Sequence, residues 1–471
     1  MRSHQSRPLA LMLPAGIIAC GIATSTAMAG SGGDVSLREL TPWIQDVIKT
    51  GQGLPSEMDW NAPYAPTREE AIQAINARPV LSGPELTFGT DHFLIHYTLE
   101  GRDIATEDQV AWAADALEVT WNREINELGY PEPPSDGTRG GDARYDVYWT
   151  FQIGTYGYCS GETLVDENSM TSYLALGQWM NQVETQVTVA HEFFHALHFA
   201  MDALEETWWF EVTATWMEDL VYDDINDYYN YLDDPFENPE TPINSSTSIM
   251  YGHAIWGHTL SERFGADVIK DIWFKASESA APAALATNLS VIEQKYGDSW
   301  ARVLHNFRES MFDLSRFSEG DGYALAIGDG SAGEVSMTTT VTRYATDGEG
   351  EIEPTAANLI EFEVTGDEPG TLTVEYTGST GLVASLLVMR TDGSIEERFS
   401  DTMVGASATF ELEDFGGTYT RAVMVVSNSL VNTAAPYSFS VDVPEWHNSG
   451  GCSIVPTSGG HSQSGIAGLM I

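Results

Sequence analysis

The hydrophobic and polar positions of the first half of the chain switch between strand-like and helix-like patterns. Phe93, Ile95 and Tyr97 alternate with Leu94 and His96, which predicts a strand, and apolar residues spaced three and four apart predict a helix from Thr106 to Gly129. Two more strands are predicted at 145–151 and near 173–176, followed by a helix over about 183–202, which holds no Pro or Gly. This order of elements indicates an α+β lobe with a mixed sheet.

A series of helices is predicted next. Asn181 and Glu184 form a capping box for the helix that starts near 183, and a second helix carries the aromatic-rich stretch from Thr207 to Asp219. An acidic loop over 222–242 separates it from a helix at 250–265, which Gly265 closes. Further helices at 267–276, 289–296 and 299–313 complete a helical lobe.

Alternating apolar and polar residues return in the last part of the chain. A glycine-rich segment, 319–334, predicts a flexible linker. Beyond it, short alternating runs separated by turn residues predict an all-β sandwich at 335–445. The expected strands are 359–364, 371–376, 382–389, 406–412, 422–426 and 437–443.

The two ends of the chain have different compositions from the middle. Residues 1–29 have the features of a signal peptide that is cleaved after Ala29, which predicts a secreted or cell-surface protein. A lipobox ending at Cys20 is an alternative and would give a lipid-anchored form. Residues 30–90 are interpreted as an N-terminal extension or propeptide, and 446–471 as a disordered Gly/Ser-rich tail.

The formal net charge of −48 restricts the partners of the protein. Nucleic acid is not expected as a partner, because its phosphates would be repelled by so acidic a surface. Beyond the leader, no run of about 18 apolar residues indicates a transmembrane helix. Some of the acidic residues could bind Ca²⁺, although the segment from Asp223 to Asp227 lacks the spacing of an EF-hand.

The predicted helix at 183–202 carries the motif His191-Glu192-Phe-Phe-His195. Side chains four apart stack on one helical face, with Cβ atoms about 5–6 Å apart, so both imidazoles can reach one cation. Zinc accepts such ligands, and Glu192 is placed to act as the general base on a metal-bound water. An alternative is a core helix whose histidines only form hydrogen bonds.

The next helix supplies a candidate third ligand. Glu211 and Glu218 fall on one helical face among aromatic residues, where a carboxylate is costly unless it is paired or coordinated. Glu211 follows His195 by enough residues for a turn and a returning helix, so it is the expected ligand. Glu218 is the alternative ligand, and otherwise it would lie beside the ligands or face solvent.

These residues together resemble the gluzincin family of zinc peptidases. In that family H-E-x-x-H is followed by a helix of the type W-x-x-E-G-x-A, and here Trp208-Trp-Phe-Glu211-x-x-Ala214 follows the histidine motif. Val212 stands where the family pattern usually has Gly. The upstream sequence, residues 92–148, is similar to that of a group of largely uncharacterised secreted bacterial proteins of this type. The resemblance implies a zinc metallopeptidase domain at 91–318.

A gluzincin also needs a Tyr or His donor for the oxyanion that develops on the substrate. The resemblance makes Tyr251 the first candidate and His253 the second. The alternative is that Tyr251 is packed and His253 is exposed. No helix-breaking Gly would turn His198 toward the metal, so we expect it to lie next to the ligands or simply to be packed.

The resulting hypothesis is a secreted zinc-dependent metallopeptidase that acts on a protein or peptide substrate. One Zn²⁺ would be bound by His191, His195 and Glu211, and Glu192 would activate the attacking water. One alternative is a catalytically inactive relative that binds its partner at the cell surface. Another is an acidic structural protein stabilised by calcium, with the histidines in its core.

Overall fold

The computed structural model describes residues 78–151, 156–279, 281–327, 335–341, 347–363, 369–398 and 407–442. All of them belong to one compact unit, Val35–Ile471. Several predictions concern residues outside this set: the signal peptide, the lipobox at Cys20, the N-terminal extension up to residue 77, and the tail at 446–471.

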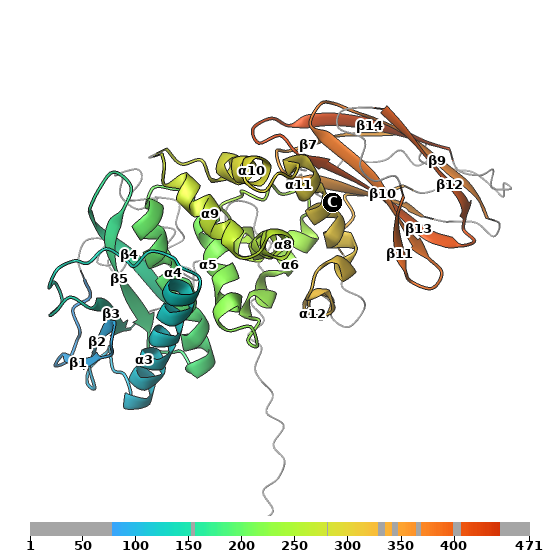
Figure 1. Cartoon of the computed structure of the whole chain (residues 1–471). Coiled ribbons are helices and arrows are strands. Elements are labelled where there is room, and N and C mark those ends of the chain that lie inside the picture. The colour runs from blue at the N-terminus through green and yellow to red at the C-terminus, as the bar shows by residue number, and fades with distance from the viewer. Residues whose placement is uncertain are drawn as a thin grey trace, which may run out of the picture. The chain divides into compact units, whose positions relative to one another are not determined.

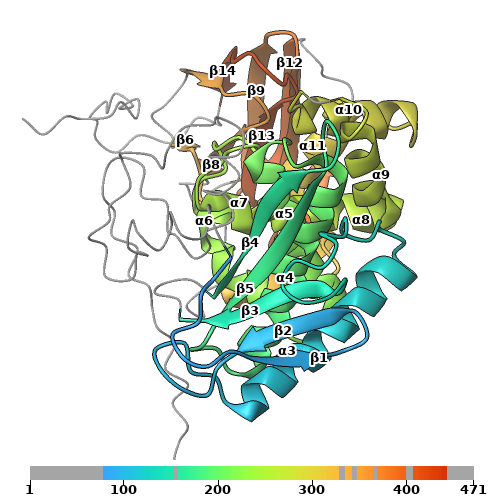
Figure 2. The ribbon, with the colours of Figure 1, turned by 90° about the vertical axis from the view of Figure 1, so that its left-hand side faces the viewer.

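The first layer is a mixed sheet in the order β1-β2-β3-β5-β4 (Figure 2). Strands β2, β3 and β5 run parallel, whereas the edge strands β1 and β4 are antiparallel to their neighbours. The three strands predicted from the sequence are confirmed as β2, β3 and β5, and the two edge strands were not predicted. The bounds are Leu86–Gly89 (β1), Phe93–Tyr97 (β2), Tyr145–Thr150 (β3), Gly157–Leu164 (β4) and Met170–Gly177 (β5).

Two capped helices pack with this sheet (Figure 1). Helix α3 (Glu107–Trp121) starts at a capping box formed by Thr106 and Gln109, and a π-helical segment, Asn122–Glu127, continues it. Helix α4 (Gln182–Asp202) starts at the predicted box, in which Asn181 Oδ1 accepts from the backbone N–H groups of Val183 and Glu184. Helix α4 packs against β4, β5 and α3, so its buried face lies over the edge of the sheet.

The following helices form the second layer. The helix predicted at 250–265 is divided at His253 into α7 and α8, and Gly265 closes it with φ of 87°. Within the described ranges, no helix combines the length and apolar character needed to cross a bilayer. The bounds are Thr207–Val221 (α5), Asp227–Tyr231 (η2, a 3₁₀ helix), Asp233–Glu237 (α6), Ile249–Gly252 (α7), Ala254–Phe264 (α8), Asp267–Ala276 (α9), Ala284–Gln294 (α10), Trp300–Phe312 (α11), Leu314–Arg316 (η3) and Gly320–Ala326 (α12).

Helix α12 lies in the segment that was predicted as a flexible linker. Its glycines permit close packing: a Cβ atom on Gly320 would lie 1.8 Å from Leu314 O, and one on Gly322 would lie 2.2 Å from Tyr229 Oη. Tyr323 is buried, and its hydroxyl lies 2.9 Å from that of Tyr228. Tertiary packing therefore orders the start of this segment, while residues 328–334 lie outside the described part.

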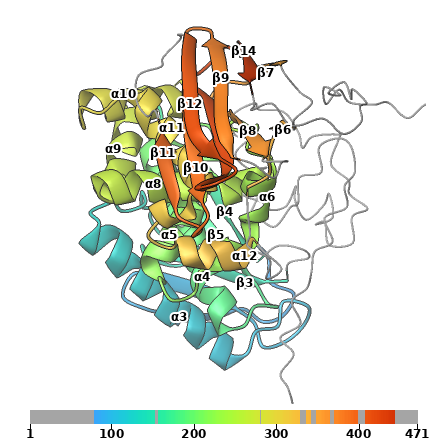
Figure 3. The same ribbon diagram turned by 90° about the vertical axis from the view of Figure 1, so that its right-hand side faces the viewer.

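The last part of the chain is a curled sheet of nine strands (Figure 3). Its two halves, β6-β8-β13-β10-β11 and β12-β9-β14-β7, are joined by one residue pair, Phe415 with Tyr419, and enclose one apolar core. Phe362 of β8 meets Phe439 of β14 edge-on across that core. The bounds are Thr339–Val341 (β6), Asp347–Ile352 (β7), Ala357–Glu363 (β8), Gly370–Gly378 (β9), Leu382–Arg390 (β10), Ile395–Arg398 (β11), Ser407–Phe415 (β12), Tyr419–Asn428 (β13) and Ala435–Asp442 (β14).

Helix α11 packs on the outer face of β10 and β13. Its His305 is buried, with Nδ1 2.7 Å from Ser427 Oγ and Nε2 2.9 Å from Ser385 Oγ, while Trp300 Nε1 donates to Ser429 O. These two strands are therefore buried on both faces, which explains their nearly continuous apolar sequences. The described residues have the predicted α+β class, with helices and a first sheet followed by a second, all-β part.

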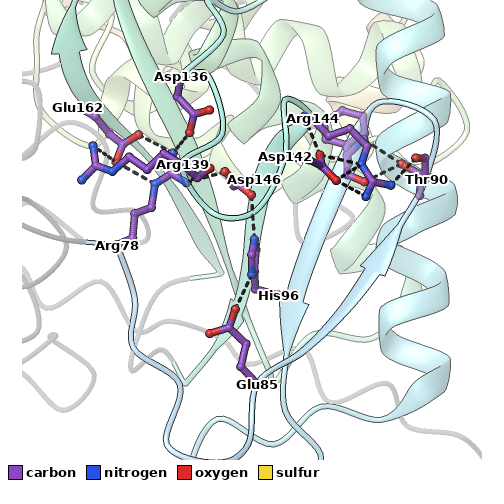
Figure 4. A network of polar contacts seen from close by, with 11 residues as sticks. Arg78, Glu85, Thr90, His96, Asp136, Arg139, Asp142, Arg144, Asp146 and Glu162 are labelled. Atoms are coloured by element: carbon purple, nitrogen blue, oxygen red, sulfur yellow. Dashed lines mark hydrogen bonds and ion pairs between the residues drawn. The ribbon is translucent and has the colours of Figure 1, made fainter.

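A polar network ties the first described residues to the sheet (Figure 4). The Arg78 guanidinium contacts three carboxylates, those of Asp136, Asp146 and Glu162. The His96 ring lies between Asp146 Oδ1 and Glu85 Oε1, at 2.8 Å from each. Burial lowers the pKa of His96, but its hydrogen bonds to these two acids outweigh that effect and raise the pKa above 6.5. Residues 78–90, predicted as part of an extension, are thus built into the sheet.

Candidate metal centre

His191 and His195 present their rings on one face of α4, one turn apart. The ring centroids are 4.7 Å apart, and both side chains are buried. Helix α5 packs against α4 and brings Glu211 between them: Glu211 Oε2 lies 3.2 Å from His191 Nε2 and 3.6 Å from His195 Nε2. One ligand atom from each of the three residues lies within 4.8 Å of the other two.

The atoms of this group fit a small divalent cation. Donor atoms about 2.1 Å from a tetrahedral zinc lie about 3.4 Å from one another, which is close to the two separations measured to Glu211 Oε2. His195 Nε2 and Glu211 Oε1 are both buried and have no hydrogen-bond partner among the described residues. Such atoms are costly to bury unless something binds them, and two imidazoles with one carboxylate form a ligand set that zinc favours.

The electrostatics keep Glu211 ionised. Burial alone would raise the pKa of its carboxyl group, but the neighbouring imidazoles of His195 and His191 lower that pKa to about 2. A carboxylate at this position therefore carries its negative charge at neutral pH and can act as a ligand.

Glu218, the alternative ligand in the sequence analysis, occupies the other side of His191. Its Oε1 lies 2.6 Å from His191 Nδ1, whereas Glu211 faces Nε2 of the same ring. The Nδ1–H group donates to the Glu218 carboxylate, and Nε2 is left to face the centre. A carboxylate in this position orients a metal-binding imidazole and increases its basicity.

A second chain of contacts fixes the tautomer of His195. The Thr213 hydroxyl donates to Trp209 O at 2.7 Å, so at Oγ1 it accepts from His198 Nε2 at 3.1 Å. Burial lowers the pKa of His198 well below its ordinary value, so this ring is neutral and its Nδ1 carries no proton. His198 Nδ1 therefore accepts from His195 Nδ1, 3.2 Å away.

The consequence is that both ligand imidazoles offer the same nitrogen. His195, like His191, has its Nδ1 in a hydrogen bond away from the centre and turns Nε2 toward Glu211. Trp273 Nε1 also donates to Thr213 Oγ1, at 3.2 Å, and the Trp273 ring stacks on His198 with centroids 4.2 Å apart. His198 thus contacts the candidate ligand His195, which is one of the two arrangements expected for it.

Glu192, between the two histidines in sequence, is fully buried at the edge of the sheet. Strand β4 passes close over it: a Cβ atom on Gly157 would lie 3.2 Å from Glu192 Cγ and 3.0 Å from Thr188 Cγ2. A side chain at this position would press on Thr188 and Glu192, so the glycine favours this close approach of the strand.

The two candidate oxyanion donors lie in different surroundings. The Tyr251 ring is 6.3 Å from the His191 ring, measured between centroids, so Tyr251 borders the centre. His253 is fully buried rather than exposed, near Ile243 and the guanidinium of Arg308, and burial lowers its pKa to about 3. Of the two, the structure brings Tyr251 to the centre, and no contact of His253 with the centre is present among the described residues.

Comparison with known proteins identifies a family. Residues 106–385, more than half of the chain, match a family of unknown function, DUF6055. The chain belongs to this family. The DUF6055 match includes the whole candidate centre, from Gly157 to Tyr251.

Two other comparisons concern curated proteins and solved structures. No curated protein matches this DUF6055 chain. A solved structure that it resembles is the pre-peptidase C-terminal domain of collagenase from Bacillus anthracis, at 12% identity and a TM-score of 0.17, over 23% of this chain and 97% of that one.

Sequence reasoning did not single out Thr213 or Gly157. Thr213 differs from Thr215 only by its place on the helix, so no sequence signal separates the residue that contacts His198 from its neighbour. Gly157 lies in a segment rich in glycine and tyrosine, 153–159. A glycine within a strand can indicate that the strand approaches another segment closely, and this is the sequence signal for Gly157.

Proposed function

We propose that the protein is an exported, zinc-dependent metallopeptidase of the gluzincin type. The observation that carries the proposal is the meeting of Glu211 Oε2 with His191 Nε2 at 3.2 Å and with His195 Nε2 at 3.6 Å. Three further features support it: both imidazoles turn Nε2 toward Glu211, His195 Nε2 and Glu211 Oε1 have no hydrogen-bond partner among the described residues, and a glutamate follows the first histidine.

In this proposal His191, His195 and Glu211 would hold one Zn²⁺. Bound zinc acts as a Lewis acid that polarises a carbonyl and makes water a stronger acid. Glu192 would take the proton of the attacking water and deliver it to the leaving amine, as a general base and then a general acid. Tyr251 would donate its hydroxyl hydrogen to the oxyanion that forms on the substrate.

The test separates metal binding from hydrolysis. Zinc content is measured by mass spectrometry of the purified protein, and hydrolysis is measured with casein and a mixed peptide library. Glu192→Gln should keep zinc and lose activity by about 100-fold or more, because only the proton acceptor is removed. His191→Ala should lose both zinc and activity. Glu293→Gln changes an exposed carboxylate on α10 and should behave as wild type.

Two results would contradict the proposal. A Glu192→Gln protein as active as wild type would remove Glu192 from its role as the base. Wild-type protein that holds zinc yet cleaves neither casein nor the peptide library would favour the alternative, a catalytically inactive protein that binds a partner at the cell surface.

A further inference from the structure

A group of acidic side chains, separate from the candidate ligands His191 and His195, lies at the end of α5. It consists of Asp219 on α5, Asp223 on the loop that follows, and Glu319, the residue before α12. One carboxylate oxygen from each residue lies within 4.8 Å of the other two. Segments far apart in the sequence thus place three carboxylates in one small volume.

Among the described residues, no positive side chain compensates these charges. Within the described ranges, no lysine or arginine forms an ion pair with any of the three acids. His258 Nδ1 is 4.0 Å from Asp219 Oδ2, but burial lowers the pKa of His258 to about 3, so its ring is neutral at pH 7. Burial and the charges of Glu319 and Asp223 together raise the pKa of Asp219 to about 7.

Asp219 provides a second, separate observation. Its side chain is only 7% exposed, and its Oδ1 has no hydrogen-bond partner among the described residues. A buried carboxylate oxygen without a donor, beside two other acids, is strongly unfavourable by itself. It requires either a proton or a cation.

We infer that Asp219, Asp223 and Glu319 bind a calcium ion. The three ligands are carboxylate oxygens, which hard cations such as Ca²⁺ prefer, whereas the zinc ligands proposed above include two imidazole nitrogens. Ca²⁺ takes about 6–8 oxygen ligands, and Asp223 is exposed, so water can reach the ion and complete its shell. This site goes beyond the proposed function and does not depend on it.

Hydrogen bonds from two tyrosines position Glu319 independently of a bound ion. Glu319 Oε2 accepts hydrogen bonds from the hydroxyls of Tyr228 and Tyr229, both on η2, the second at 2.9 Å. The Tyr228 ring stacks on His258, with centroids 4.7 Å apart. A bound ion would therefore join the end of α5, the loop to η2 and the start of α12, and stabilise the helical layer.

The test uses the zinc-loaded full chain in about 0.15 M salt, which screens weak binding to the acidic surface. Terbium replaces calcium in oxygen sites, and Tyr228 and Tyr229 are close enough to sensitise its luminescence. We expect a terbium signal that calcium displaces, and a Tm that calcium raises. Asp223→Asn should weaken calcium binding at least tenfold. Asp224→Asn, an equally exposed neighbour outside the group, is the matched control and should bind as wild type.

A buried variant supplies an independent measurement. Asp219→Asn should show no calcium-dependent rise in Tm, and in calcium-free buffer it should be more stable than wild type, because one of three mutually repelling charges is gone. The inference is overturned if calcium changes neither the luminescence nor the Tm of wild type, in which case the group holds a proton. It is equally overturned if Asp223→Asn and Asp224→Asn bind calcium alike. None of these outcomes depends on peptidase activity.

Discussion

Replacing Thr213 by Val tests the proposed control of the His195 tautomer. Valine has nearly the same shape as threonine but lacks the hydroxyl that accepts from His198 Nε2 and Trp273 Nε1. Without that acceptor, nothing fixes the proton of His198 on Nε2. His195 Nδ1 then loses its defined acceptor, and its Nε2 is no longer held as the deprotonated nitrogen.

The expected magnitude follows from the contacts that are lost. Two buried N–H groups lose their acceptor, and each unsatisfied donor costs about 1–3 kcal/mol, so unfolding should be easier by about 2–6 kcal/mol. Zinc affinity should fall by about 10- to 100-fold, as for other losses of a group that orients a metal ligand. Thr213→Ser keeps the hydroxyl and should keep zinc affinity near that of wild type.

The assay is urea unfolding of the zinc-free protein together with zinc affinity from competition with a chelator. Thr215→Val is the matched control: Thr215 is also fully buried on α5, but its hydroxyl has no hydrogen-bond partner among the described residues. That variant should change the unfolding free energy by less than about 1 kcal/mol. If Thr213→Val keeps wild-type zinc affinity, or if both valine variants weaken zinc equally, the tautomer argument is wrong.

Three other substitutions test separate parts of the structure. Glu218→Gln should lower zinc affinity by about tenfold and Glu211→Gln by far more, because only Glu211→Gln removes a proposed ligand. Zinc affinity is measured by competition with a chelator, and equal losses in the two variants would contradict the assignment. Gly157→Val should displace the Glu192 carboxylate and reduce peptide hydrolysis while zinc content stays at one ion; unchanged turnover would show that the strand can move away. Because the pKa of His96 is raised in the folded state, the stabilisation from its charged form is fully present below about pH 6.5 and is lost as pH rises through the folded-state pKa. Urea unfolding should therefore show that wild type loses more stability than His96→Gln between about pH 6 and 8. Parallel pH profiles for the two proteins would exclude this role.

Much of the candidate centre was predictable because its signals are local. The capping box at Asn181, the absence of helix breakers and the spacing of the two histidines are properties of one helix, and they fix the ring arrangement before any tertiary contact forms. Glu211 was separable from Glu218 by its distance along the chain and by its place in the family pattern. Which nitrogen of His191 each acid meets depends on how α5 packs against α4, and no local pattern contains that information.

The elements that were not predicted depend on packing between distant segments. Strand β7 reads Asp-Gly-Glu-Gly-Glu-Ile, an unfavourable strand sequence, but the aromatic rings of Tyr437 and Phe439 on β14 cover its glycines. Strand β4 and helix α12 likewise contain glycines that permit close approach to a neighbour. A glycine in the sequence has the same appearance whether it serves a turn, a linker or such a contact.

The contacts of Arg78 show which N-terminal proteolytic cuts would disturb the sheet lobe. Its guanidinium is shared by carboxylates from three separate stretches of the sheet lobe, and the strand that follows, β1, pairs with β2. A cut after Arg78 would remove the cation that these acids share, leaving Glu162 with Arg139 and Asp146 with His96, and a cut at residue 90 would also remove the edge strand β1. A cut upstream of Arg78 would keep these contacts.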